Sequence, residues 1–192
     1  MLKEGTKAPS FSLESDSGKR VSLADFAKDT LVVYFYPKDN TPGCTREAVE
    51  FAAAQKKLIA AGAKVVGVSK DSVKSHCGFR DKYSLNFPLL SDPSLSMHNA
   101  YGTYGDKVMY GKKIKGTIRS TFVIKNGKVT HVFSPVKVDG HVEKVLAAIT
   151  GKEAPSATSK PVAKSVKKAP AKTAATSAKN APAKKKATAK KR

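Results

Sequence analysis

The stretch Leu31-Val-Val-Tyr-Phe-Tyr-Pro37-Lys-Asp-Asn-Thr41-Pro-Gly-Cys44 joins an apolar run to the start of a predicted helix. Residues 31–36 are apolar, β-branched or aromatic, which indicates a strand buried on both faces of a sheet. Thr41 suits the cap of the next helix and Pro42 its first turn, so Cys44 lies where the helix begins. Unpaired N–H groups and the helix dipole favour a thiolate there, which makes Cys44 a candidate nucleophile.

The segments around this stretch predict an α/β domain. The helix after Thr41 is expected to bury a stripe made of Val49, Phe51, Ala52, Leu58 and Ile59. The other expected elements are a hairpin at 11–23, a buried strand at 63–68, a helix at 72–83 capped by Asp71, an extended segment at 87–90, a short helix at 93–101, a loop at 102–118, a hairpin at 120–133 with an Asn126-Gly127 turn, and a helix at 142–149. Strands that alternate with helices pair in parallel, and the late hairpin adds antiparallel strands. This order predicts a thioredoxin-like fold with a central mixed sheet flanked by helices.

The composition changes near residue 151. Residues 1–151 mix apolar runs, turns and charges, and they suffice for one domain with a hydrophobic core. Residues 152–192 are almost only Lys, Ala, Pro, Ser and Thr, and they carry +12 of the chain's net charge of +21. So little apolar surface cannot offset the entropy lost on ordering. We therefore predict a domain at 1–151 and a disordered basic tail at 152–192.

Two cysteines, Cys44 and Cys77, do not make a secreted disulfide scaffold, and the N-terminus lacks the apolar core of a signal peptide. No apolar run is long enough to span a membrane, so we expect a reducing cytoplasm, where a cysteine pair is more often catalytic than structural. The four histidines have no metal-ligand spacing and are expected to be mostly exposed. No nucleotide or flavin motif appears, so no cofactor or metal is implied.

The pattern Pro37-x-x-x-Thr41-x-x-Cys44 resembles the active-site motif of the peroxiredoxins. The wider string YPKDNTPGCTRE, which ends at Glu47, is similar to the bacterioferritin comigratory protein branch, also called peroxiredoxin Q. Three further segments resemble that branch in the same order: FPLLSD at 87–92, MYGK at 109–112 and RSTFVI at 119–124. The resemblance covers about residues 3–150 and leaves out the tail.

The resemblance implies a thiol peroxidase that reduces hydrogen peroxide and organic hydroperoxides. By position, Cys44 is similar to the peroxidatic cysteine, Thr41 to the hydroxyl residue that holds the peroxide, and Pro37 to the residue that shields the pocket. Arg119 matches the arginine that favours the thiolate, although an ordinary surface arginine at a strand start is the alternative. A fixed guanidinium supplies positive potential without deprotonating. Glu47 is expected only to accept a bond or complement the dipole at the helix start, without a catalytic part.

One position departs from the branch. Many members carry a second cysteine five residues after the first, where this chain has Val49. The other thiol is Cys77, in the helix predicted at 72–83, and a second group within the branch places its resolving cysteine about one turn further on, near Arg80. Residues 77 and 80 share a helical face, so Cys77 is a possible resolving cysteine. A one-cysteine mechanism, with Cys77 a buried apolar side chain, is the alternative.

The resemblance also implies a thioredoxin or a similar dithiol as reductant, and a monomer. The basic tail at 152–192 predicts salt-sensitive, nonspecific DNA binding through phosphates, since it has no aromatic residues to stack on bases. The tail indicates nucleoid association, or a nuclear signal in a eukaryotic source; a merely solubilising tail is the alternative. Two rival functions stay open: a disulfide oxidoreductase on the same fold, and a nucleic-acid-binding protein with a passive domain.

Overall fold

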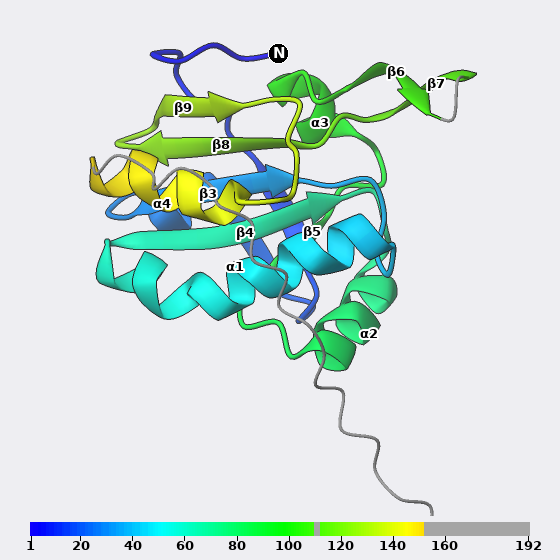
Figure 1. The fold of residues 1–192 in the computed structure, drawn as a ribbon, viewed down its shortest axis with the longest axis horizontal. Helices are drawn as coiled ribbons and strands as arrows, with labels where there is room; N and C mark the ends of the chain where they lie inside the picture. The colour runs from blue at the N-terminus through cyan, green and yellow to red at the C-terminus, as the bar shows by residue number, and fades with distance from the viewer. Residues whose placement is uncertain (110–111, 152–192) are drawn as a thin grey trace, which may run out of the picture. The chain divides into compact units, whose positions relative to one another are not determined.

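The computed structural model describes residues 1–109 and 112–151. Within them the main sheet has seven strands in the order β2-β1-β5-β4-β3-β8-β9 (Figure 1). These strands are β1 (Ser12–Ser15), β2 (Arg20–Ser22), β3 (Thr30–Phe35), β4 (Ala63–Ser69), β5 (Leu89–Ser91), β8 (Ser120–Lys125) and β9 (Lys128–Phe133). The predicted tail at 152–192 lies outside the described residues, so its disorder and the boundary at 151 stay predictions.

Strand β3 is central and decides the arrangement of the sheet. It pairs in parallel with β4, which pairs in parallel with β5, whereas β8 pairs with β3 in the antiparallel direction. The predicted thioredoxin-like mixed sheet is therefore confirmed. The carboxyl ends of β3, β4 and β5 meet at one edge of the sheet, where open α/β sheets commonly place their sites.

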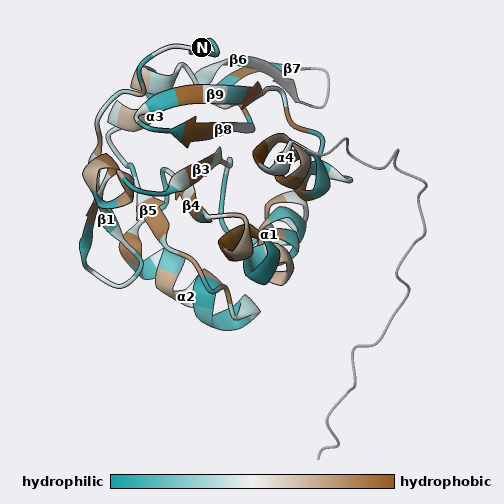
Figure 2. Ribbon diagram, turned by 90° about the vertical axis from the view of Figure 1, so that its left-hand side faces the viewer, coloured by the Kyte–Doolittle hydropathy of each residue, from teal (hydrophilic) through white to brown (hydrophobic). Residues whose placement is uncertain are grey.

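The side chains of β3 alternate between two apolar cores. Val32 and Tyr34 face a core shared with the helices α1 (Pro42–Ala60) and α4 (His141–Thr150). Leu31, Val33 and Phe35 face a second core, which includes residues of α3 (Ser96–Tyr101). Figure 2 shows α1 and α4 on one face of the sheet and α3 on the other. Burial on both faces explains why this strand is almost continuously apolar.

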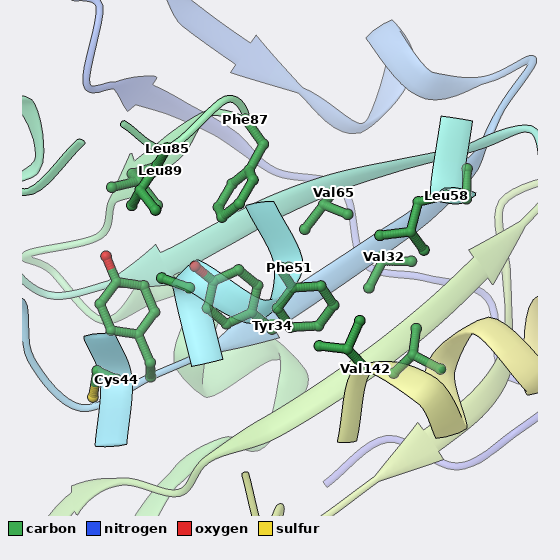
Figure 3. Close-up of a cluster of buried hydrophobic side chains, with 14 of the residues drawn as sticks. Val32, Tyr34, Cys44, Phe51, Leu58, Val65, Leu85, Phe87, Leu89 and Val142 are labelled. Atoms are coloured by element: carbon green, nitrogen blue, oxygen red, sulfur yellow. The ribbon is translucent and has the colours of Figure 1, made fainter. Parts of the chain in front are cut away.

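Tyr34 organises the first of these cores. Its ring stacks on that of Phe51 from α1 at a centroid distance of 4.8 Å (Figure 3). Gly67 of β4 lies beneath the same ring, and a Cβ there would come within 2.8 Å of Tyr34. Glycine is therefore required at this point of the sheet, because the aromatic ring occupies the space of any side chain.

Helix α1 buries a different stripe from the one predicted. Its buried residues are Cys44, Glu47, Ala48, Phe51 and Leu58. Val49 and Ile59 are exposed, so the prediction was wrong for them. The buried set follows the spacing of one helix face, and this face includes a carboxyl group, that of Glu47.

The helix α2 (Val73–Tyr83) confirms the helix predicted at 72–83, with a different cap. Ser72, and not Asp71, is the N-cap: its hydroxyl accepts a bond from the amide of Ser75 at 3.3 Å. Asp71 instead accepts bonds from the amide of Asp39 and the hydroxyl of Ser69. The wrong cap was predicted because both residue types can cap a helix.

The segment predicted as a loop at 102–118 contains two paired strands. They are β6 (Tyr104–Met109) and β7 (Lys112–Thr117), and this hairpin projects from the main sheet in Figure 1. Part of the MYGK segment, residues 110–111, lies outside the described residues. The hairpin predicted at 120–133 is confirmed: Asn126 and Gly127 have φ values of 51° and 70°, as a tight turn of this kind requires.

The prediction that the histidines are mostly exposed was wrong. His76, His98 and His141 are buried, and each has a polar partner. Their partners lie far away in the sequence or in a loop, so spacing along the chain gave no signal for them. None of the helices in the described part of the chain has the length and apolar character of a membrane-crossing segment.

Candidate active site

Cys44 is the third residue of α1, and its side chain is buried, with 1% of the residue exposed. In Figure 3 it lies at one end of the core that contains Tyr34 and Phe51. The first turn of α1 directs free backbone N–H groups and the positive end of its dipole towards this position. The sequence prediction of a cysteine at a helix start is therefore confirmed.

Arg119 lies directly against Cys44. Its Nη2 donates to Cys44 Sγ at 3.2 Å, and only 16% of its side chain is exposed. Strand pairing explains this contact: Ser120 of β8 is opposite Phe35 of β3, so the residue before β8 reaches the carboxyl end of β3. A guanidinium held at this distance favours negative charge on the sulfur. Arg119 is thus no ordinary surface arginine.

Glu47 completes this cluster, and the sequence did not indicate its importance. It lies one helical turn after Cys44, is fully buried, and its Oε2 accepts a bond from Arg119 Nη1. Its Oε1 has no hydrogen-bond partner among the described residues. Burial raises the pKa of Glu47 to about 7, against the opposing effect of the Arg119 charge. The spacing of three residues from Cys44 was the signal that could have placed it on the same face.

The guanidinium of Arg119 therefore bridges the side chains of Glu47 and Cys44. Burial alone would lower the pKa of Arg119, but the nearby Glu47 and Cys44 raise it. The hydroxyl of Tyr34 is buried without a hydrogen-bond partner among the described residues. Burial, followed by the charges of Glu47 and Cys44, raises the pKa of Tyr34 well above its usual value. The cluster thus combines one permanent cation, a neutral phenol, and a carboxyl group and a thiol that bond different nitrogens of that cation.

Thr41 and Pro37 lie in the loop that leads into Cys44. Thr41 occupies the N-cap position as predicted, but its side chain makes no capping bond. Its Oγ1 instead donates to the carbonyl of Lys38 at 3.0 Å, which holds the loop closed on itself. Pro37 is half-buried directly after Tyr36. Both residues are therefore on the segment next to the thiol, on either side of a residue with positive φ, Asn40.

Cys77 is not joined to this cluster. It lies in α2, is partly exposed, and both cysteines are free thiols. Its sulfur lies 3.6 Å from Arg80 Nη2 and 3.7 Å from Asp81 Oδ2, both in its own helix. Arg80 also bonds Asp16, so this guanidinium is shared among several acceptors. Of the predicted site residues, the structure brings Arg119 to Cys44 and leaves Cys77 with other partners.

Comparison with known proteins assigns the chain to a family. The model of the AhpC/TSA family matches residues 5–132. Peroxiredoxin Bcp of Xanthomonas campestris is 45% identical over 138 residues, 71% of this chain and 86% of that protein. Peroxiredoxin Bcp of Escherichia coli is 40% identical over 146 residues, 76% of this chain and 94% of that protein. The structure of Xanthomonas campestris peroxiredoxin Q matches with a TM-score of 0.70 and 44% identity, over 73% of this chain and 90% of that chain.

The family match at residues 5–132 covers the residues that form the Cys44 cluster. A buried thiol at a helix start, with a fixed guanidinium at its sulfur, is the type of site that thiol-based peroxide chemistry requires. The chain therefore belongs to the AhpC/TSA family, in its Bcp or peroxiredoxin Q branch, and is a peroxiredoxin, a thiol peroxidase.

Proposed function

We propose that Cys44 is the peroxidatic cysteine and that it reduces hydrogen peroxide and organic hydroperoxides. The observation that carries this proposal is the contact between Cys44 Sγ and Arg119 Nη2 at 3.2 Å, in the first turn of a helix. The bacterioferritin comigratory protein of Xanthomonas campestris is described by its alkyl peroxide reduction activity. That activity supports the inclusion of organic hydroperoxides among the substrates of this chain.

In the first step the Cys44 thiolate attacks one oxygen of the peroxide. A sulfur–oxygen bond forms, the oxygen–oxygen bond breaks, and the leaving oxygen takes up a proton to give water or an alcohol. The sulfur is oxidised by two electrons to a sulfenic acid. Negative charge develops on the oxygens, and Arg119 and the backbone N–H groups of the first turn are the donors available to stabilise it. The Thr41 hydroxyl donates to the carbonyl of Lys38 in this structure, so it must rotate away from that carbonyl to hold the peroxide. Pro37 shields the loop side of the pocket.

In the second step the thiol of Cys77 attacks the sulfenic sulfur, a disulfide forms, and water leaves. Single serine variants of Xanthomonas campestris peroxiredoxin Q replace two cysteines that stand 36 positions apart. Cys44 and Cys77 stand 33 positions apart, so a cysteine with the wider spacing would be at Arg80. Three residues are about one helical turn, which leaves both positions on the same face of α2.

The disulfide must then be reduced by two electrons to restore both thiols. A dithiol protein of the thioredoxin type supplies them by attack on one sulfur, with a mixed disulfide as intermediate. The more exposed sulfur, that of Cys77, is the accessible point of attack. The Cys44 sulfur is then a good leaving group, because Arg119 stabilises the thiolate that is released.

Peroxide consumption by three proteins tests this proposal. With a dithiol reductant present, Cys44→Ser is expected to lose peroxide consumption entirely. Cys77→Ser is expected to keep the first oxidation of Cys44 but to lose steady-state turnover with thioredoxin. Normal turnover of the Cys44 variant would overturn the peroxidase assignment, and unchanged turnover of the Cys77 variant would favour a one-cysteine mechanism. Reduction of insulin disulfides, measured on the same samples, is the control for disulfide oxidoreductase activity.

We also propose that residues 152–192 tether the enzyme to DNA. The observation is the charge of +12 carried by these residues, with no aromatic side chain among them. Binding driven by released counterions weakens steeply with salt and does not depend on base sequence. A chain that ends at Gly151 is expected to keep the peroxidase rate and lose retention on DNA. Equal retention of both chains between about 50 and 200 mM salt would contradict the tether.

A further inference from the structure

The loop between β3 and α1 is fastened to α2 by a buried polar network centred on Asp39. Its Oδ1 accepts a bond from the hydroxyl of Tyr36 at 2.7 Å. Its Oδ2 accepts bonds from Ser75 Oγ at 2.6 Å and from His76 Nδ1 at 2.9 Å. The backbone amide of Asp39 donates to Asp71 at 2.9 Å. Four interactions thus converge on one residue that is 5% exposed.

Asp39 is ionised at the centre of this network. Burial alone would raise its pKa, but the hydrogen bonds from His76 and Ser75 lower it overall. A carboxylate only accepts hydrogen bonds, so the Nδ1 of His76 carries the proton that it donates to Asp39. The Nε2 of His76 has no hydrogen-bond partner among the described residues. The pairing with Asp39 is therefore the main polar interaction that holds this imidazole.

The two segments that this network joins carry the reactive residues. Asp39 lies midway between Pro37 and Thr41, the two loop residues beside Cys44. His76 is the neighbour of Cys77 in α2. A displacement of α2 from the loop must therefore break the bonds to Asp39, and the same bonds keep the loop in place around Cys44.

Formation of a disulfide requires a displacement of at least one of these two segments. Cys44 is buried against Arg119, whereas the sulfur of Cys77 contacts Arg80 and Asp81. A disulfide brings two sulfurs to about 2.0 Å and two Cα atoms to within about 7 Å. Neither sulfur has the other as its partner in the described structure, so one segment moves before they react.

We propose that Asp39 and His76 form a latch that holds Cys44 in its peroxide-reactive arrangement and limits the rate at which Cys77 reaches it. They are positioning residues, since neither touches the sulfur. The part of the proposal that concerns Cys77 rests on the proposed function. The latch therefore controls what fraction of the Cys44 sulfenic acid forms a disulfide and what fraction is oxidised further by a second peroxide.

The chain contains a matched control for this latch. Asp92 and His98 form a second buried pair, with Nδ1 to Oδ2 at 2.8 Å and both side chains fully buried. His98 packs on Phe35 in the other core, on the face of the sheet opposite the Tyr36 side. The two pairs are alike in chemistry and burial, but only the Asp39 pair joins the loop to α2.

The first experiment compares Asp39→Asn with Asp92→Asn. After one peroxide addition, the rate of Cys44–Cys77 disulfide formation is followed by acid quench, alkylation and mass spectrometry. Asp39→Asn is expected to speed disulfide formation by roughly tenfold and to slow the peroxide step, because bonds to a charged group are lost. Asp92→Asn is expected to leave both rates within about twofold. Equal effects in the two variants, or slower disulfide formation in Asp39→Asn, would overturn the latch.

A milder variant tests the same network in case Asp39→Asn does not fold. Ser75→Ala removes one donor to Asp39 and leaves the His76 pair in place. It is expected to change both rates in the same directions as Asp39→Asn, but by only a few fold. Urea unfolding of every variant shows whether a change in either rate follows only from a loss of overall stability.

A second measurement does not depend on the role of Cys77. In a Cys77→Ser background without peroxide, the rate at which a maleimide labels buried Cys44 reports opening of the loop. Asp39→Asn is expected to raise this rate by roughly tenfold and Asp92→Asn to leave it unchanged. If labelling rises but the wild type forms no disulfide, the latch stands and the resolving role of Cys77 fails. If the wild type forms the disulfide but labelling does not rise, the latch fails.

Discussion

Cys44 and Cys77 are both thiols next to an arginine, but they differ in burial and in how firmly that arginine is held. Cys44 is buried, and the guanidinium at its sulfur is itself mostly buried and anchored by Glu47. Cys77 is partly exposed, and the guanidinium at its sulfur, that of Arg80, has 30% of its side chain exposed. One thiol has a fixed electrostatic environment, and the other lies at the surface of a helix.

This difference matches the different requirements of the two proposed reaction steps. Attack on a peroxide needs a preorganised charge beside the sulfur, which burial strengthens. The proposed attack of Cys77 on a sulfenic acid needs mobility, because two sulfurs must come within bonding distance of each other. We therefore expect changes around Cys44 to act on the first step and changes around Cys77 to act on the second.

Separate replacement of Arg119 and Arg80 is expected to give the largest difference in the rate of the peroxide step. Arg119→Met removes the positive charge at Cys44 and is expected to slow the peroxide step by about 10²- to 10³-fold. Arg80→Met removes the corresponding group at Cys77 and is expected to leave this step within about twofold. Stopped-flow measurement of the first oxidation compares the two. Similar losses in both variants would contradict the proposed division between the thiols.

The pH dependence of stability tests how strongly the Cys44 cluster is buried. The pKa of Glu47 is raised to about 7, so the folded state loses stability as pH rises from about 4.5 to 7. The pKa of His141 is lowered to about 4, by burial and then by Lys144 and Arg119, so the folded state loses stability as pH falls from about 6.5 to 4. Each effect is worth about 3 kcal/mol, and in the wild type they largely cancel.

Urea unfolding of two variants separates these opposite slopes. Glu47→Gln leaves the His141 effect alone, so its unfolding free energy is expected to rise between pH 4 and 6.5. His141→Gln leaves the Glu47 effect alone, so its unfolding free energy is expected to fall over the same range. A flat profile in one variant would contradict the pKa shift of the side chain that this variant keeps, and parallel profiles would contradict both shifts.

A smaller effect on catalysis is expected from the anchor of Arg119. Above pH 7, where Glu47 is mostly ionised, Glu47→Gln keeps the shape of the side chain but loses the charge that holds the guanidinium, so we expect the peroxide step to slow by roughly tenfold. Glu50→Gln, one turn further along α1 and partly exposed, is the matched control and is expected to change little. An equal loss in both variants would remove the special role of Glu47.

The strands and the position of Cys44 at a helix start could be predicted because their signals are local. The apolar run of β3, the Asn126-Gly127 turn and the helix start at Cys44 each occupy a few consecutive residues. The parallel and antiparallel pairing directions followed from general rules of connection. The β6–β7 hairpin was missed because its strands pair mainly with each other and lack the apolar alternation that marks a strand against a core.

The polar interior could not be predicted from spacing. Asp39 meets His76 across 37 positions of the sequence, and Arg119 meets Cys44 across 75. The role of Arg119 was expected only from the resemblance, and the burial of Glu47 and His76 was missed. Such contacts arise from tertiary packing, which places charged residues on faces that hydrophobic patterns assign to apolar ones.

The fate of the two sulfurs after one equivalent of peroxide tests the proposed mechanism most directly. Intact and peptide mass spectrometry of the reduced full chain follows it, with alkylation of the remaining thiols. We predict the loss of two hydrogens from the chain and a peptide pair that joins Cys44 to Cys77. A lasting sulfenic acid on Cys44 would contradict resolution by Cys77, and oxidation that leaves Cys44 as a free thiol would contradict its role as the peroxidatic residue.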